Sequence, residues 1–184
     1  KTIFVDPDAE LNKRDYSALS DLGFRRSGNH IYRPHCKDCS ACISARIPVE
    51  LFVASKSQKR VLNLNRDIHT SIQLPAYSDE YYALYERYIR VRHHDGDMHP
   101  TSKEQFESFL IHSQYNTRFI ELRNDQELLG VAVVDYLEQG ISAIYTFFNP
   151  DLPQRSLGKL AILKLIQLAQ NQDLPYLYLG YWVK

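Results

Sequence analysis

The chain has few of the features that mark membrane or secreted proteins. Of its 184 residues three are cysteine, one is methionine and one is tryptophan. No stretch approaches the ~20 consecutive apolar residues that a membrane-spanning helix needs. The first residues, Lys-Thr-Ile-Phe-Val-Asp, lack the anatomy of a signal peptide, and an odd number of closely spaced cysteines argues against a disulfide framework. We therefore expect a cytoplasmic protein that does not act at a membrane.

Acidic residues are scarce in one region. Between residues 24 and 66 only Asp38 and Glu50 are acidic. The Lys and Arg residues of the same region are Arg25, Arg26, Arg33, Lys37, Arg46, Lys56, Lys59, Arg60 and Arg66. The formal net charge of the whole chain is +0, because residues 67–138 are rich in acids. A partner responds to local charge, so this basic region favours a polyanion such as a nucleic acid, with a solvated charged face as the alternative.

The cysteines stand in a single run, Cys36, Cys39 and Cys42, with two residues between neighbours. The spacing matches the first three thiols of a ferredoxin-type iron–sulfur run, but Arg46 stands where the fourth thiol belongs. Zinc held by three thiolates and a histidine, for example His35, is a second interpretation. A third is that the thiols pack a tight loop as small hydrophobes. The sequence leaves these alternatives open.

The first part of the chain has the pattern of a small β-rich domain, which we place at residues 1–70. Residues 15–22 predict a short helix that ends at Gly23. Strand-like residues on both sides of Gly28-Asn29 predict a hairpin, and residues 43–53 alternate like a further strand. Residues 55–67, polar and basic, form either a linker or a helix.

The second part, residues 71–184, begins with two helices. Ser78 is a good N-cap for a helix that runs to about His93, and residues 101–104 resemble a capping box for a shorter helix. Residues 118–122, 128–137 and 141–148 predict three consecutive antiparallel strands. Ser156 caps a further helix, and residues 176–181 predict a last strand.

This order of elements resembles the core of the GNAT N-acyltransferase superfamily. In that fold a strand-to-helix turn holds an acyl carrier, and the acyl group reacts in a cleft between neighbouring strands. We therefore expect an α+β fold, with a small β-rich N-terminal domain and a GNAT-like mixed sheet with helices.

Asp135 is the residue of interest in the predicted sheet. It interrupts the apolar strand at residues 131–136, so it lies either at an open strand end or buried with a hydrogen-bond partner. At an open end it could orient or deprotonate an amine nucleophile. A structural pairing with a nearby Arg is the alternative. Tyr145, Tyr178 and Tyr181 are candidates for lining the same cleft.

The turn at residues 154–160 would begin the long helix, and a helix N-terminus with a glycine can take a phosphate. GNAT enzymes that use acyl-CoA have a loop here with Gln or Arg first, Gly fourth and Gly or Ala sixth. Arg155 and Gly158 match this loop, but Leu160 occupies its last small position. A branched side chain there disfavours coenzyme A, because it crowds the approach of a pyrophosphate.

Several motifs occur together and in order. They are Phe24-Arg-Arg-Ser-Gly, Tyr32-Arg-Pro-His-Cys36, Arg46-Ile-Pro-Val, Ser57-Gln-Lys-Arg60, Asn65-Arg66-Asp67, Val133-Val-Asp135, Ser142-Ala-Ile-Tyr-Thr-Phe-Phe-Asn-Pro, Ser156-Leu-Gly158 and Tyr178-Leu-Gly-Tyr181. This combination resembles the arginyl-tRNA–protein transferase family along nearly the whole chain after residue 22. The resemblance implies an enzyme that moves an amino acid from its charged tRNA to the N-terminal amine of a protein beginning with Asp or Glu, which marks that protein for degradation. The bacterial branch transfers leucine, so leucyl-tRNA is the expected donor.

The resemblance also implies roles for particular residues. We expect Asp135 and Tyr145 to act in catalysis, and Arg33 and Arg46 to bind the acidic side chain of the acceptor. The aminoacyl pocket would be lined by Phe147, Tyr178 and Tyr181. The tRNA would be bound by Arg25, Arg26, Lys59, Arg60 and Arg66. A tight loop formed by Cys36, Cys39 and Cys42 would hold Arg33 and Arg46. Ester aminolysis requires no cofactor, so zinc or an iron–sulfur cluster at the cysteines is a testable alternative.

Two other functions fit parts of the sequence. An acyl-CoA-dependent GNAT N-acetyltransferase would share the sheet order and use Arg155 with Gly158. A non-enzymatic RNA-binding module would use the basic region, with the cysteines as a zinc site. Family members usually continue beyond the strand at residues 176–181 with a segment that carries Cys and Lys, so we expect residues beyond both ends of this chain.

Overall fold

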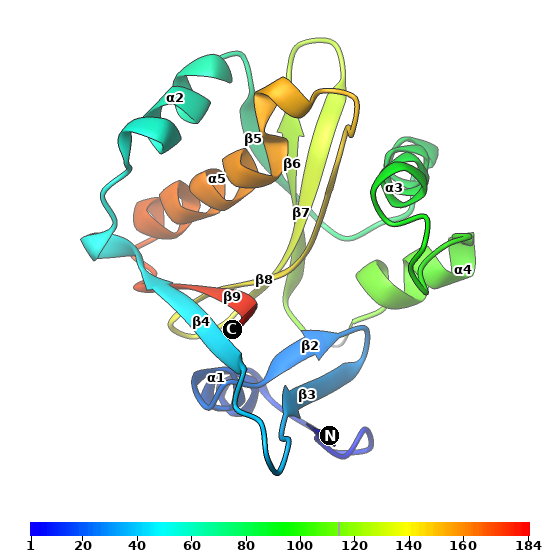
Figure 1. The fold of residues 1–184 in the computed structure, drawn as a ribbon, viewed down its shortest axis with the longest axis vertical. Helices are drawn as coiled ribbons and strands as arrows, with labels where there is room; N and C mark the ends of the chain where they lie inside the picture. The colour runs from blue at the N-terminus through cyan, green and yellow to red at the C-terminus, as the bar shows by residue number, and fades with distance from the viewer. Residues whose placement is uncertain (114) are drawn as a thin grey trace.

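The computed structural model describes residues 1–113 and 115–184 (Figure 1). Within them a six-stranded mixed sheet has the order β4-β9-β8-β7-β6-β5. Its strands are β4 (Cys42–Pro48), β5 (His69–Gln73), β6 (Thr117–Arg123), β7 (Leu128–Tyr136), β8 (Gly140–Phe148) and β9 (Tyr176–Val183). The mixed sheet confirms the predicted α+β class and the GNAT-like order of helix, helix, three strands, helix and strand.

Helices cover both faces of this sheet (Figure 1). On one face, α2 (Lys56–Leu64) and α5 (Leu157–Asn171) enclose an aliphatic core that includes Leu129, Leu160 and Ile166. On the other, α3 (Asp79–Arg92) and α4 (Lys103–Phe106), extended by a wide turn at Glu107–Ile111, enclose an aromatic core. Residues of the two cores alternate along each central strand, because successive side chains of a strand point to opposite faces.

The first 34 residues form a separate unit at one end of the sheet. It contains α1 (Lys13–Asp21) and a three-stranded antiparallel sheet of β1 (Thr2–Phe4), β3 (His30–Pro34) and β2 (Arg25–Ser27). Tyr16 and Ile31 pack with Leu137, which directly follows β7, and with Tyr178 of β9, and these contacts join the unit to the rest of the chain. The predicted helix and hairpin are therefore present.

Local sequence signals explain most of the helix ends. Asn12 caps α1 and Ser55 caps α2, each in a reciprocal capping box. Ser78 caps α3 as predicted. The cap of α4 is Ser102, one residue later than predicted. Ser156 precedes α5, but its side chain makes no capping hydrogen bond and its backbone is left-handed, with φ 51°.

Strands β1 and β5 had not been predicted, and the strand predicted at residues 43–53 ends at Pro48 in a short 3-10 turn, Val49–Leu51. The large sheet takes β4 from the first part of the chain, and β5 spans the predicted boundary at residue 70. The division into domains at that residue stays a prediction. In the part of the chain that the structure describes, no helix has the length and apolarity needed to cross a membrane.

Candidate active site

Strands β8 and β9 separate after a short ladder, and we call the region between their separated edges the cleft. These neighbours are parallel and pair at only three positions in the described residues, from Gly140↔Tyr176 to Ser142↔Tyr178. Beyond Ser142, β8 continues to pair with β7, and beyond Tyr178, β9 continues to pair with β4. The facing edges of the two strands therefore have backbone groups outside the β8–β9 ladder, and one of them, the carbonyl of Leu179, accepts a hydrogen bond from Arg25 Nε at 2.6 Å.

Bulges in both strands produce this separation. In β8 the pairing moves from Val133↔Tyr145 to Val134↔Ala143, which leaves Ile144 as an extra residue. In β9 it moves from Arg46↔Tyr178 to Ser44↔Tyr181 and so leaves an extra residue beside Gly180. A bulge bends its strand and redirects its side chains. Both bulges begin directly after the last β8–β9 pair, so they place the apex of the cleft at Ser142 and Tyr178.

A groove lies at the N-terminus of α5, and we call it the donor groove. Its lining residues are Arg92, Phe148, Leu152, Pro153, Ser156, Leu157, Gly158 and Lys159. Because Ser156 does not cap the helix, the first amide groups of α5 are left for a ligand, and the helix dipole favours an anion there. Gly158 allows α5 to approach β8, since an added Cβ would lie 3.0 Å from the Phe148 ring. Arg92 and Lys159 add positive charge.

The contacts of Asp135 do not fit the role predicted for it as a base at an open strand end. Its side chain is fully buried and accepts hydrogen bonds from Tyr16 Oη (2.9 Å), Thr117 Oγ1 (2.6 Å) and two nitrogens of Arg26 (2.6 and 2.9 Å). These donors occupy the carboxylate from several sides. As placed, Asp135 has the alternative role, a structural carboxylate paired with an Arg.

Arg25 and Arg26, predicted to bind tRNA, are both buried. Burial alone would lower the pKa of Arg26, but the hydrogen bonds and the charge of Asp135 outweigh it and raise that pKa. Arg25 donates only to backbone carbonyls, among them Leu179 at 2.6 Å, and is in no ion pair within the described residues. Neither guanidinium is open to a phosphate, so both work as internal braces in this structure.

Lys59, Arg60 and Arg66, also predicted to bind tRNA, are exposed, and their role at a phosphate stays a prediction. Lys59 and Arg60 are exposed on α2, next to Lys56 on the same face, and Arg66 follows the helix. The opposite face of α2 carries Val61, which packs in the core under α5. The helix therefore presents a stripe of cations to solvent close to the donor groove.

The three residues predicted to line an aminoacyl pocket do not come together. Phe147 is buried in the core beneath α3, with its ring 5.5 Å from that of Tyr85. Tyr178 donates to Asp21 (2.6 Å), and Tyr181 donates to the carbonyl of Gly23 (2.7 Å). Burial raises the pKa of both tyrosines to about 12, so both phenols are neutral hydrogen-bond donors near neutral pH.

Tyr145, the other predicted catalytic residue, directly follows the bulge in β8. Its ring lies in the aromatic cluster with Tyr85, Tyr88 and Phe109, and its hydroxyl contacts Met98 Sδ at 3.9 Å. Burial holds the pKa of its phenol well above the ordinary value. It is therefore a neutral donor on the aromatic face of β8.

Arg33 and Arg46, predicted to bind the acceptor, both lie near the bulged half of β9. Arg46 is the cross-strand neighbour of Tyr178, lies over the Tyr176 ring at 4.1 Å and pairs with Asp21 at 2.6 Å. Arg33 lies over the Phe24 ring at 5.0 Å and donates to the carbonyl of Leu22. Arg46 is the more accessible cation, because its ion pair with Asp21 is exposed.

The cysteine loop lies between β3 and β4. Cys36 and Cys39 form an isolated antiparallel bridge, and all three thiols are free and exposed. Among residues 1–113 and 115–184, no group of three or more His, Cys, Asp or Glu side chains is placed to hold a metal ion. The zinc and iron–sulfur interpretations of these cysteines stay predictions, and no step of the reaction proposed below depends on either.

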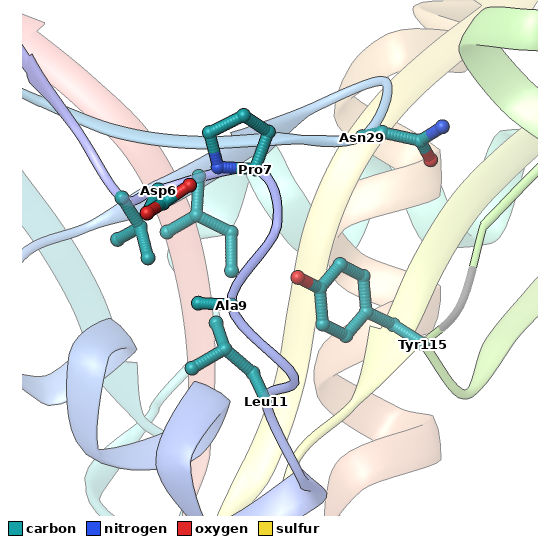
Figure 2. A pocket seen from close by; sticks show the side chains of 8 residues that line it. Asp6, Pro7, Ala9, Leu11, Asn29 and Tyr115 are labelled. Carbon is teal, nitrogen blue, oxygen red and sulfur yellow. The ribbon is translucent and has the colours of Figure 1, made fainter.

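Two further features were not expected from the sequence. Ser142, at the apex of the cleft, is fully buried, and its hydroxyl has no hydrogen-bond partner in the described part of the chain. Its sequence signal is a hydroxyl between the apolar residues Ile141 and Ala143 of β8. A small hollow lies between the N-terminal segment and the hairpin, where Figure 2 shows the Tyr115 ring beside the loop that carries Ala9 and Leu11. None of the predicted site residues lines it.

Comparisons with known proteins identify relatives of the chain. The family described as "Arginine-tRNA-protein transferase, N terminus" matches residues 1–60, and its counterpart "Arginine-tRNA-protein transferase, C terminus" matches residues 80–184. The chain is 53% identical over 183 residues to an "Aspartate/glutamate leucyltransferase" of Pseudomonas savastanoi pv. phaseolicola, covering all of this chain and 78% of that protein. A protein of the same name from Teredinibacter turnerae is 52% identical over 184 residues and is covered to 76%.

Solved structures support the fold. L-PGS from Bacillus licheniformis superposes with a TM-score of 0.58 at 14% identity, over 91% of this chain and 49% of that one. The C-terminal domain of a putative lysylphosphatidylglycerol synthetase from Agrobacterium fabrum gives 0.57 at 16% identity, over 90% and 50%. The chain thus spans about half the length of each of these structures, and the likeness concerns the fold alone.

Proposed function

The chain belongs to the arginine-tRNA-protein transferase family, and on this basis we propose that it transfers leucine from leucyl-tRNA to the N-terminal amine of proteins that begin with aspartate or glutamate. The observation that carries the proposal is the identity of about one half, over the whole chain, to relatives with that name. Family membership sets aside both the acyl-CoA acetyltransferase and the non-enzymatic RNA-binding module. Charged tRNA is a cytoplasmic substrate, so we propose that location.

The reaction is the aminolysis of an ester. The nitrogen of the acceptor amine attacks the leucyl carbonyl carbon, the bond from that carbon to the ribose oxygen breaks, and the ribose oxygen takes up a proton as the amide forms. An α-amino group has a pKa of about 7.7–8.0, so a useful fraction is neutral near neutral pH. The enzyme then has to align the two substrates and support the negative charge on the carbonyl oxygen.

The cleft between β8 and β9 suits this alignment. The leucyl ester would lie at the separated strand edges beyond Ser142 and Tyr178, where backbone groups are outside the β8–β9 ladder. The phenol of Tyr145, which directly follows the bulge in β8, is our candidate for a hydrogen-bond donor to the leaving ribose oxygen; burial raises its pKa, so the phenol is neutral. With Asp135 fully engaged, we propose that the amine loses its proton to solvent rather than to that carboxylate.

The donor and the acceptor would approach from different elements. The 3′ end of the tRNA would enter the donor groove at the N-terminus of α5, and the acceptor stem would lie along the cations of α2. Arg46 would take the carboxylate of the acceptor's first residue in place of Asp21, since that ion pair is exposed and can be exchanged.

The test is a transfer assay with purified protein, labelled leucyl-tRNA and peptides beginning with Asp, Glu or Ala. We expect label to appear in the Asp and Glu peptides, no label in the Ala peptide, and no transfer after ribonuclease treatment. A parallel reaction in which arginyl-tRNA competes as the donor shows whether leucine or arginine is transferred. Failure to label the acidic peptides from either donor would overturn the proposal.

A further inference from the structure

The turn after α2 is hydrogen-bonded to the loop that enters α5. From these contacts we infer that Asn65 and Asp67 are positioning residues for the tRNA donor. They touch neither substrate in this arrangement. They act through Arg155, the residue that precedes Ser156 and the donor groove. The inference rests on the function proposed above and specifies how the donor end is held.

Asn65 holds the backbone of this loop. It is the C-cap residue of α2 and is only 1% exposed, which is unusual for asparagine. Its amide nitrogen donates to the carbonyl of Val61 in its own helix at 2.8 Å and to the carbonyl of Arg155 at 2.9 Å. One buried amide group therefore ties two elements that are 90 residues apart in the chain.

Asp67 holds the side chain of the same residue. Nη2 of Arg155 lies 2.6 Å from both carboxylate oxygens of Asp67. This hydrogen bond holds the pKa of Asp67 below its ordinary value, so the carboxylate stays charged at neutral pH. Arg155 is thus fixed at its main chain by Asn65 and at its guanidinium by Asp67, both from one short turn.

The restraint acts on the next residue. Ser156 has a left-handed backbone with φ 51°, a conformation that L residues other than glycine rarely adopt. Such a conformation persists where surrounding contacts determine it, and it occurs often at functional sites. The first amide groups of α5 follow directly, so the geometry at Arg155 and Ser156 sets the direction in which they face the donor groove.

The far end of the loop has its own restraint. Arg87 of α3 pairs with Asp151, and the Asp151 backbone donates to Asn149. Asn65 and Asp67 therefore restrain the end of the loop that borders the donor groove, and other contacts restrain its far end. Since Asn65 also ends α2, the same contact couples the helix that carries Lys59 and Arg60 to the site of the donor's 3′ end.

The experiment compares two donors, full-length leucyl-tRNA and a leucylated oligonucleotide that has only the unpaired 3′ end. We expect Asp67→Asn and Asn65→Ala to raise the KM for both donors about tenfold, equivalent to about 1.4 kcal/mol, because both donors use the groove. The KM for the acceptor peptide should stay near the wild-type value. Lys59→Ala should raise the KM for full-length tRNA alone.

Controls separate positioning from general damage. Asp67→Glu should restore most of the donor KM, and Asp125→Asn, an exposed carboxylate in the β6–β7 turn, should match the wild type. Because Asn65→Ala removes a buried group, its melting temperature is measured as well, and exposed Asp67 carries the test if that variant unfolds.

An unchanged donor KM in folded Asp67→Asn would overturn the positioning role, as would an equal rise in the acceptor KM. A wild-type protein that transfers no leucine from either donor overturns the proposed function itself. The two failures are therefore distinguishable.

Discussion

Arg26 and Asp135, 109 residues apart in the chain, form an ion pair in which both side chains are fully buried, with Nε 2.6 Å from Oδ2. Tyr16 and Thr117 complete the hydrogen bonds of the carboxylate. Arg26 belongs to β2 and Tyr16 to α1, whereas Asp135 and Thr117 lie on the large sheet. The pair therefore fastens the N-terminal unit to the sheet beside the cleft.

Breaking this pair should cost stability. In Asp135→Ala the guanidinium of Arg26 is left buried without its counter-ion, and we expect the free energy of unfolding to fall by about 3–5 kcal/mol. Urea denaturation measures this loss. Asp151→Ala, which breaks the exposed pair with Arg87, should cost less than about 1 kcal/mol. A stable but inactive Asp135→Ala protein would instead favour a direct catalytic role for the carboxylate.

The β8–β9 ladder that ends at the apex of the cleft begins at a glycine. A Cβ added at Gly140 would collide with the backbone carbonyl of Tyr176, the residue that opens the β8–β9 pairing. We expect Gly140→Ala to lower the free energy of unfolding by about 1–3 kcal/mol and to reduce kcat, because the two strands must move apart. Gly180→Ala is the matched control, since nothing lies within 4 Å of its added Cβ. Equal effects of the two variants would contradict this view of the apex.

The buried hydroxyl of Ser142 gives a test in which stability and activity move differently. Because this hydroxyl lacks a partner in the described part of the chain, Ser142→Ala should leave the free energy of unfolding unchanged or raise it by about 1 kcal/mol. If the hydroxyl binds the substrate ester, kcat falls in the same variant. Thermal unfolding and transfer kinetics on one preparation measure both. A destabilised variant would show that the hydroxyl has a structural partner.

The cations on α2 should give the donor affinity its dependence on salt. Removing one cation that binds a phosphate should reduce the slope of log K against log salt concentration by about 1. We expect Lys59→Ala with Arg60→Ala to bind tRNA more weakly at low salt and with a slope smaller by about 2. Lys13→Ala, exposed on α1, is the control and should keep the wild-type slope. An unaltered slope in the double variant would place the stem elsewhere.

Glu121 should make stability depend on pH in the acid range. Burial raises its pKa, but hydrogen bonds from Ser71, Arg123 and Tyr81 outweigh burial, and the net shift is downward. A carboxyl whose pKa is lower in the folded protein stabilises the fold above its unfolded pKa of about 4.3. This contribution is lost as the pH falls through the lower folded value. Urea denaturation across the acid range should show a flatter pH dependence for Glu121→Gln than for the wild type.

The central part of the fold could be predicted, because its strands pair with their neighbours in the sequence. Strands β6, β7 and β8 follow one another through short turns, and their alternation of side chains matches two buried faces. Strand β5, residues His69–Gln73, has mainly polar residues and mostly exposed side chains at the edge of the sheet, so its sequence carries no periodic signal. Its pairing with β6 is a tertiary contact that no local pattern contains.

The candidate site divides in the same way. The donor groove could be anticipated, because Arg155 and Gly158 lie in one short motif at a helix start. The role of Asp135 could not, since its partner Arg26 comes from a distant strand, and a carboxylate in an apolar strand fits either a base or a brace. Phe147 lies in the aromatic core beneath α3, whereas Tyr178 and Tyr181 donate to Asp21 and to the carbonyl of Gly23, so the pocket that combines them stays a prediction.

The pairing of β4 with β9 has a consequence for how the chain is made. Cys42 pairs with Val183 and Pro48 with Tyr176, so β4 gains this partner only after β5, β6, β7 and β8 have been made. Until then β4 is an open edge, which invites pairing with other chains. Since β9 also borders the cleft, the cleft has both of its edges only after β9 has been made and has paired with β4.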